Sequence, residues 1–197
     1  MFTLTEPSNS DIASFITSQS NLPFSYSEVG ATRFDPADSA APRGYKLDHN
    51  RVELGRGAEV FQRAVGALNQ WRQFELGWVT LAPPGVKLEK GATVAIKTRT
   101  GGLWSLSAAR VVYMIDEEEP IRRFGFAYGT LPDHVERGEE RFSIEWNSSD
   151  DSVWYDILAF SQPWHPLVRL GFAYARILQK RFVRDSLTLM RAIANHP

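Results

Sequence analysis

The chain has 197 residues, of which 43% are apolar and 23% charged, and it contains no cysteine. Its 22 basic and 23 acidic side chains nearly cancel, which argues against affinity based on neutralising phosphates, so we expect no nucleic-acid partner. The lack of cysteine excludes disulfides, thiolate nucleophiles and thiolate metal sites. No segment has the roughly 18 apolar residues of a membrane span, and the first residues do not resemble a secretory signal. The sequence therefore predicts a cytoplasmic protein with no transmembrane segment.

At this length we expect a single domain over residues 1–197, in which residues 1–44 precede a regular core at 45–197. Within the first part, Ser8 or Ser10 can cap a helix that runs to about Ser18 and could form a lid or a flap. A stretch rich in Pro, Ala and Asp, Arg33–Gly44, has the composition of a linker.

The core begins with a predicted strand, Tyr45–Leu54, followed by an amphipathic helix over Gly57–Trp71. Six further segments are rich in β-branched and aromatic residues and are separated by short turns, which favours antiparallel hairpins and brings the count to about seven strands. These segments are Leu76–Leu81, Ala92–Thr100, Leu103–Asp116, Arg122–Thr130, Val135–Trp146 and Ser152–Ser161. A long helix over about His165–Ala194 ends the chain.

This order of elements predicts an α+β fold of the helix-grip type, in which a curved antiparallel sheet wraps around the C-terminal helix. The helix has two stripes, and the space between it and the sheet is either filled by side chains or left as a pocket. The apolar stripe consists of Leu167, Tyr174, Leu178, Phe182 and Leu189. The basic stripe, Arg169, Arg176, Lys180, Arg184 and Arg191, is either a solvated face or a surface for an anionic partner.

The segment DHVERGEERFSIEW at 133–146 is the most informative. With a period of two, His134, Glu136, Gly138 and Glu140 share a face with the apolar residues that follow them. One interpretation is a bulge at Gly138, which would return the upstream residues to solvent. The alternative is that Glu140, together with His134 and Glu136, projects into a pocket, where a carboxylate would need a partner.

Arg181 and Asp185 on the C-terminal helix are candidates for that partner, because they lie at and within its apolar arc. The alternative is that they form only an intrahelical ion pair at the edge of the core. Aromatic side chains supply the remaining candidate lining. Phe124, Phe126 and Tyr128 alternate with Gly125, Ala127 and Gly129, so their rings line the grip if the small face meets the first helix or solvent, and lie outside it if that face meets the C-terminal helix. Trp154 and Tyr174 complete the candidate set.

Metal binding is not indicated, because only His134 and Glu136 have a same-face spacing, and metal sites usually need three or four ligands. No nucleophile elbow, phosphate loop or dinucleotide fingerprint is present in the sequence, and we expect no cofactor. Asp48 and His49 are adjacent on a predicted strand, so they point to opposite sides and do not form a proton relay.

Several runs of the sequence resemble a known family. They are FSYSEVGATR (24–33), HNRVELGRG (49–57), FELGWV (74–79), GGLWSLSAARVVYMIDE (101–117), RRFGFAYGTLPDHVERGEERF (122–142), DDSVWYDILAFSQPWHPL (150–167) and QKRFVRDSLTLM (179–190). They look like the domain of unknown function 1990, an uncharacterised protein family of bacteria and plants. Its order of elements is similar to the START-like helix-grip superfamily (SRPBCC), whose members mostly enclose an apolar ligand and in some branches catalyse cyclisation or hydrolysis.

Three hypotheses on function follow. The first is a protein that binds an apolar or aromatic small molecule between sheet and helix, oriented by Tyr128, His134, Glu136, Glu140, Arg181 and Asp185. The second is an enzyme on the same scaffold, with Glu140 or His134 as a general base. The third is an interaction module that uses the basic face of the C-terminal helix.

Overall fold

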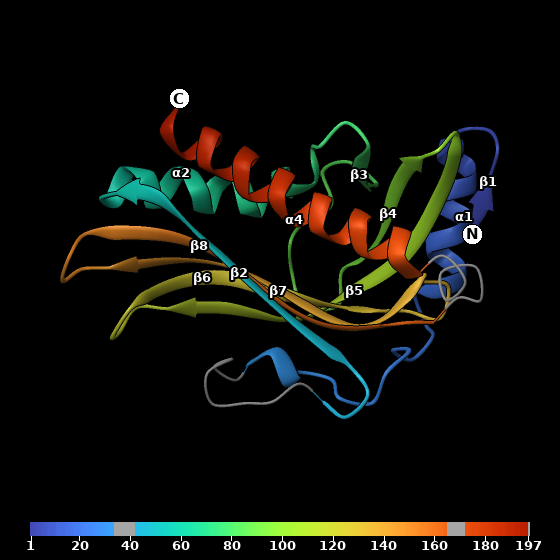
Figure 1. The fold of residues 1–197 in the computed structure, drawn as a ribbon, viewed down its shortest axis with the longest axis horizontal. Coiled ribbons are helices and arrows are strands. Elements are labelled where there is room, and N and C mark those ends of the chain that lie inside the picture. The colour runs from blue at the N-terminus through green and yellow to red at the C-terminus, as the bar shows by residue number, and fades with distance from the viewer. Residues whose placement is uncertain (34–41, 165–171, 197) are drawn as a thin grey trace.

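One strongly curved antiparallel sheet is the centre of the computed structural model, which describes residues 1–33, 42–164 and 172–196 (Figure 1). Among these residues eight strands form the sheet, in the order β2-β8-β7-β6-β5-β4-β3, with β1 beside β5. The strands are β1 (Phe2–Thr3), β2 (Lys46–Arg56), β3 (Val79–Ala82), β4 (Thr93–Thr100), β5 (Leu103–Glu117), β6 (Arg122–Thr130), β7 (Glu136–Asn147) and β8 (Ser152–Pro163). The seven predicted strands are all present, and the short β1 is an addition.

From β3 to β8 the sheet is a meander of antiparallel hairpins, in which each strand pairs with the next strand in the sequence. The exception is β2, which comes first in the core but pairs with the last strand, β8, over Lys46↔Ser161 to Arg56↔Ser152. A helix after β2 therefore has to carry the chain across the face of the sheet to the far edge, where β3 begins.

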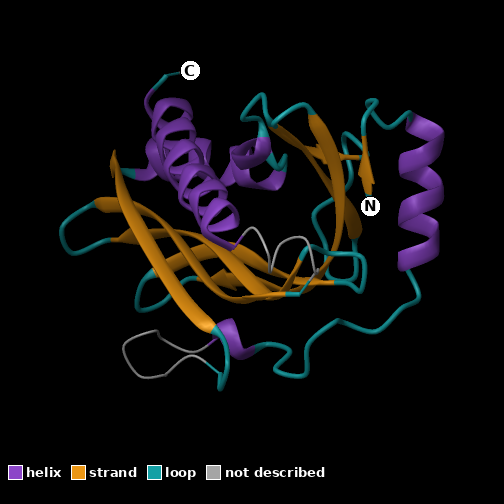
Figure 2. Cartoon of the chain, turned by 45° about the vertical axis from the view of Figure 1, so that its right-hand side comes forward, coloured by secondary structure: helices purple, strands orange, loops and turns teal. Residues whose placement is uncertain are grey.

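That helix, α2 (Ala58–Asn69), and the short turn η2 (Arg72–Phe74) lie on the same side of the sheet as the long helix α4 (Phe172–Asn195) (Figure 1). The main core lies between this inner face and the helices and includes Leu68, Phe74, Phe126, Phe142 and Tyr155. Figure 2 shows the sheet curving around α4. The α+β helix-grip architecture is thus confirmed.

The N-terminal residues pack on the opposite, outer face. Helix α1 (Asn9–Gln19) begins with a capping box in which the Asp11 N–H donates to the Ser8 hydroxyl and the Ser8 N–H donates to the Asp11 carboxylate. Its residues Ile12 and Phe15 pack against the outer side of β4 and β5. Figure 2 shows this helix on the side of the sheet away from α4. This helix therefore does not form a lid over the inner face. The short turn η1 (Ala31–Arg33) follows it.

The inward side of α4 differs from the predicted apolar stripe. Its most buried residues are Ser186, Met190 and Ala194, whereas Tyr174 of the predicted stripe is 52% exposed. The packed face is rotated toward the basic stripe, because α4 fits between β2 and α2 rather than over the middle of the sheet alone. Leu167, Arg169 and the predicted helix start at His165 lie outside the described residues. None of the helices in the described ranges could span a membrane.

Candidate functional site

A cavity of about 1200 Å³ lies between the inner face of the sheet and α4. Its wall is mainly apolar and includes Phe74, Trp78, Val79, Ile96, Phe182 and Leu187. Polar side chains gather along β7 and its neighbours, namely Asp48, Tyr128, His134, Glu136, Glu140 and Gln179. Among the described lining residues, Leu103 and Tyr174 are large apolar side chains that are exposed to solvent.

The register of β7 is what brings Glu136 and Glu140 into the cavity. Its pairing with β8 is continuous from Glu136↔Pro163 to Asn147↔Ser152, so the described strand contains no bulge at Gly138. Gly138 is required for another reason, since its φ is +146° and a Cβ on it would lie 1.9 Å from the carbonyl oxygen of Phe160. Of the two interpretations of this segment, the inward orientation is the one the structure adopts.

Glu140 and Tyr128 form a polar pair on adjacent strands. They are directly opposite each other in the β6–β7 register, and the Tyr128 hydroxyl donates a 2.5 Å hydrogen bond to Oε2 of Glu140. Glu140 is half-buried and lines the cavity. Its carboxyl group is therefore inside the protein but remains accessible from the cavity. Burial raises the pKa of Glu140 to about 7; the Tyr128 hydrogen bond opposes this shift, and the nearby Glu136 and Asp48 add to it.

Glu136 and His134 lie one step further along the same wall. Gln179 of α4 donates a hydrogen bond to Oε2 of Glu136, and burial raises the pKa of this carboxyl. The backbone N–H of Glu136 donates to Nδ1 of His134 at 3.0 Å. Burial lowers the pKa of His134 to about 4, so its imidazole is neutral at physiological pH.

Asp48 and Arg176 connect β2 to α4 beside this wall. The Arg176 guanidinium donates two hydrogen bonds to the Asp48 carboxylate, at 2.7 and 2.9 Å. These bonds hold the pKa of Asp48 below its usual value. The basic stripe that includes Arg176 was expected to be a solvated face or a surface for an anionic partner. For Arg176 neither holds, because its guanidinium is directed toward β2 and pairs with Asp48.

The structure separates the remaining predicted site residues from the polar wall. Phe124 and Phe126 face inward but belong to the core, where Phe126 packs on Trp71 at a ring distance of 4.7 Å, and neither lines the cavity. Trp154 lies on the outer face under Arg51, so its assignment to the inner face was wrong. Residues one apart on a strand point to opposite faces, and a ring count over a strand does not say which face is inner.

Arg181 and Asp185 do not face Glu140 or His134 either. Asp185 accepts a 3.0 Å hydrogen bond from the indole N–H of Trp78, and the Arg181 guanidinium lies 4.4 Å from the centre of the Trp78 ring. The two side chains therefore support a cavity-lining tryptophan from outside. Their expected role as partners of the carboxylate is replaced by Tyr128, which contacts Glu140 directly.

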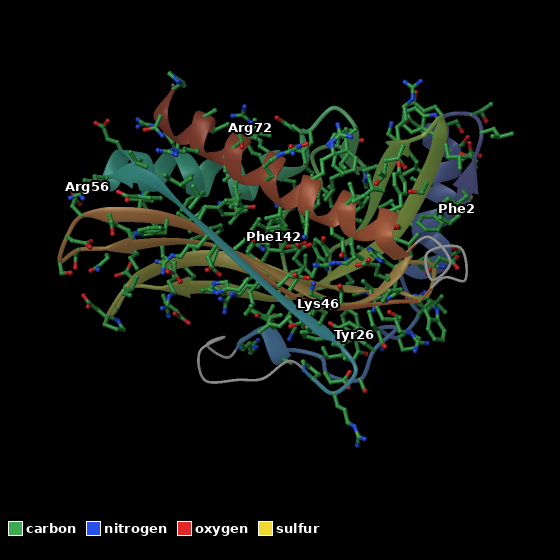
Figure 3. All side chains as sticks on the ribbon, viewed as in Figure 1. Phe2, Tyr26, Lys46, Arg56, Arg72 and Phe142 are labelled. Carbon is green, nitrogen blue, oxygen red and sulfur yellow. The ribbon has the colours of Figure 1, made fainter. Side chains whose placement is uncertain are left out.

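A second polar network lies on the outer face of the sheet, across from the cavity. Glu139 is 2% exposed, and its carboxylate accepts hydrogen bonds from the Tyr26 hydroxyl, the Gly30 and Thr32 N–H groups and the Thr32 hydroxyl. In Figure 3 the labelled Tyr26 lies below the sheet and Phe142 between the sheet and α4. Gly129 permits this approach, since a Cβ on it would lie 2.1 Å from the Tyr26 oxygen. The small face of β6 thus meets the N-terminal segment rather than a helix or solvent.

Asp156, His49 and Arg141 extend this outer network. The Asp156 carboxylate lies 2.5 Å from Nε2 of His49 and accepts a 3.0 Å hydrogen bond from Arg141, which also donates to the Thr32 carbonyl. Asp48 and His49 are thus on opposite faces of β2, as their adjacency predicted.

Sequence reasoning missed Asp48, Gln179 and Arg176 as members of the inner wall. A signal was present for Asp48, because strand alternation places it on the face opposite to His49. No local signal identifies Gln179 or Arg176, since their partners Glu136 and Asp48 are far away in sequence.

Fold and site together define a helix-grip protein with an internal, mainly apolar cavity that carries a buried carboxyl pair on one wall. The model of the family described as 'Domain of unknown function (DUF1990)' matches residues 25–189. The chain therefore belongs to this family. A UPF0548 protein of Dictyostelium discoideum is 39% identical over 96% of this chain and 94% of its own length. A UPF0548 protein of Deinococcus radiodurans is 34% identical over 93% of this chain and 94% of its own length.

A solved structure supports the fold. The hypothetical protein jhp0584 from Helicobacter pylori superimposes with a TM-score of 0.52 at 13% identity, covering 83% of this chain and 94% of that one. At this identity the likeness concerns the fold.

Proposed function

We propose that the protein binds an apolar or aromatic small molecule in the cavity between the sheet and α4. The observation that supports this is the cavity itself, whose volume of about 1200 Å³ is somewhat larger than the roughly 300–1000 Å³ of ordinary small-molecule sites and leaves room for a whole ligand. A few polar groups on an otherwise apolar wall are the usual composition of such a site, because the apolar surface supplies affinity and the polar groups set orientation. Here Tyr128, Glu140 and Glu136 supply the polar groups.

Native mass spectrometry of the protein purified gently from its own source tests this proposal directly. We expect a retained small molecule that is released on denaturation. A naphthalene-based fluorescent probe provides the quantitative assay, since Trp78 in the wall should transfer excitation energy to a bound probe.

A cavity-filling variant gives the matched comparison. Ala159 lines the cavity opposite Glu140 in the β7–β8 register, so Ala159→Phe should weaken probe binding at least about tenfold by occupying the space. Ala58→Phe, at the exposed start of α2, introduces the same ring outside the cavity and should leave probe affinity unchanged. Equal affinity in both variants would place the probe elsewhere and contradict the proposal.

A second candidate function, general acid–base catalysis on the bound molecule, is favoured by one feature. Glu140 combines a pKa of about 7 with an orientation toward the cavity, which suits a group that both accepts and donates protons at neutral pH. If this holds, Glu140→Gln purified from the same source should retain a molecule whose mass differs from that retained by the wild type, because the substrate is no longer converted. The same mass in both proteins would argue for binding alone.

A further inference from the structure

We propose that the ligand is an apolar molecule with one ammonium group, and that Glu140 binds this group while the apolar body fills the cavity. This inference rests on the proposed ligand-binding function and specifies the chemical class of the ligand.

The first step concerns the hydrogen bonds of Glu140. Among the described residues, the carboxyl receives one hydrogen bond, from the Tyr128 hydroxyl to Oε2, which leaves Oε1 available on the cavity side. The neighbours of Glu140 keep this side open. Gly138 precedes it on the same face and Ala159 lies opposite it on β8, so neither presents a large side chain that could cover the carboxyl.

The second step concerns charge. Within the described ranges, Glu140 forms no ion pair with a basic side chain, and the other acids nearby, Glu136 and Asp48, add negative charge. Arg176 is a basic group beside this wall, and both of its hydrogen bonds to a carboxylate go to Asp48. An ionised carboxylate inside a protein is unfavourable without a positive partner, so a cationic ligand supplies what this wall lacks.

The same distribution disfavours an anionic ligand. Lys180 and Arg184 also border the cavity, but both are exposed at its edge, and Arg184 bonds to Asp185 at 2.8 Å. A ligand carboxylate placed beside Glu140 would meet like charge and no available guanidinium.

The third step concerns the shape of the surroundings. Phe74, Tyr128 and Phe182 line the cavity next to Glu140, with ring centres 6.1 Å apart for Phe74–Tyr128 and 5.4 Å apart for Phe74–Phe182. Aromatic faces attract cations and also pack against an apolar body. An ammonium group at Glu140 would thus have a carboxylate on one side and rings on the other, and the remaining cavity can hold a hydrophobic moiety.

Three naphthalene probes that differ in their polar group test the proposal: the amine 2-naphthylmethylamine, the alcohol 2-naphthylmethanol and the carboxylate 2-naphthaleneacetate, each titrated at neutral pH by calorimetry. In the wild type we expect the amine to bind about tenfold more tightly than the alcohol, and the carboxylate to bind most weakly. In Glu140→Gln the amine should fall to the affinity of the alcohol, while alcohol binding stays within about twofold of the wild type. Glu140→Asp, which keeps the charge, should retain the preference for the amine. The control Glu75→Gln alters an exposed acid outside the cavity lining and should behave as the wild type.

The outcomes separate this inference from the proposed function. Alcohol binding without a preference for the amine, or a preference that survives Glu140→Gln, overturns the inference and leaves ligand binding in place. Failure of all three probes to bind removes both. If Glu140→Gln does not fold, the order of the three affinities in the wild type still decides, because tighter binding of the carboxylate than of the amine contradicts the assignment.

Discussion

The Tyr26 hydroxyl donates a 2.7 Å hydrogen bond to Glu139, a residue 113 positions later in the chain, and both side chains are buried. Three further donors from Gly30 and Thr32 reach the same carboxylate, so a single acid on β7 fastens the N-terminal segment to the outer face of the sheet. The β7 strand thus has two roles, because adjacent residues point to opposite faces: Glu139 holds the N-terminal segment, and Glu140 faces the cavity.

Removing the Tyr26 hydroxyl should destabilise the protein. We expect Tyr26→Phe to lower the free energy of unfolding by about 1–3 kcal/mol, because the buried carboxylate loses one donor and keeps its desolvation cost. Chemical denaturation measures this. Tyr174→Phe, which removes a hydroxyl from a side chain that is 52% exposed, is the control and should change stability by less than about 0.5 kcal/mol. Equal effects in the two variants would show that the contact contributes nothing to stability.

The backbone position of Gly138 predicts a large effect of a small substitution. Gly138→Ala should cost several kcal/mol, about 3 or more, because the new Cβ would lie 1.9 Å from the Phe160 carbonyl oxygen and the residue has φ of +146°. Gly66→Ala, inside α2 and with nothing within 4 Å of the added Cβ, should instead stabilise by about 0.5–1 kcal/mol. Thermal melts of the two variants in parallel check both signs. A mild effect at Gly138 would contradict the close approach of β7 and β8.

The Asp48–Arg176 pair predicts a pH-dependent loss of stability. Arg176 lowers the pKa of Asp48, so the pair stabilises the fold above the ordinary Asp pKa of 3.8, and this contribution disappears as pH falls through the lower folded value. Arg176→Gln should therefore cost about 1–3 kcal/mol at pH 7 and clearly less near pH 3. Arg191→Gln, exposed on the same helix, should have little effect at either pH. Urea titrations at the two pH values provide the measurement, and a loss that does not depend on pH would argue against the ion pair.

Glu140 predicts the opposite dependence on pH. Its folded pKa of about 7 is above the ordinary value of 4.5, so the folded protein binds this proton more tightly, and wild-type stability falls as pH rises from about 4.5 through 7. The groups that face it are Tyr128, Glu136, Asp48 and Tyr155, none of which supplies a positive charge.

Glu140→Gln removes that titration. Relative to this variant, we expect the wild type to lose on the order of 2 kcal/mol between pH 4.5 and 7.5. Denaturation of both proteins across this range is the test. A constant difference would mean that Glu140 titrates normally and is not enclosed.

The sequence by itself determined the elements of this protein. The period-two alternation of β6 and β7 and the helical period of α2 and α4 are local properties of the chain. With the turns between the segments, they predicted the order of the seven longer strands and of the two core helices, and with it the helix-grip architecture, but not the short β1. They also put His134, Glu136 and Glu140 on one face, because residues two apart on a strand share a face, but they left open whether this face and the ring of Tyr128 point into the grip.

Only the tertiary structure decided which face is inner and which distant groups meet. Alternation is symmetric, so it is equally compatible with Trp154 inside or outside, and the outer position results from how β8 pairs with β2 and β7. Likewise, the orientation of α4 about its axis brings Arg176 to Asp48. Tyr26 contacts Glu139 because Gly129 has no side chain that would occupy the position of the Tyr26 ring. Such contacts join residues that are far apart in sequence, and their partners are selected by packing of the whole chain rather than by any local period.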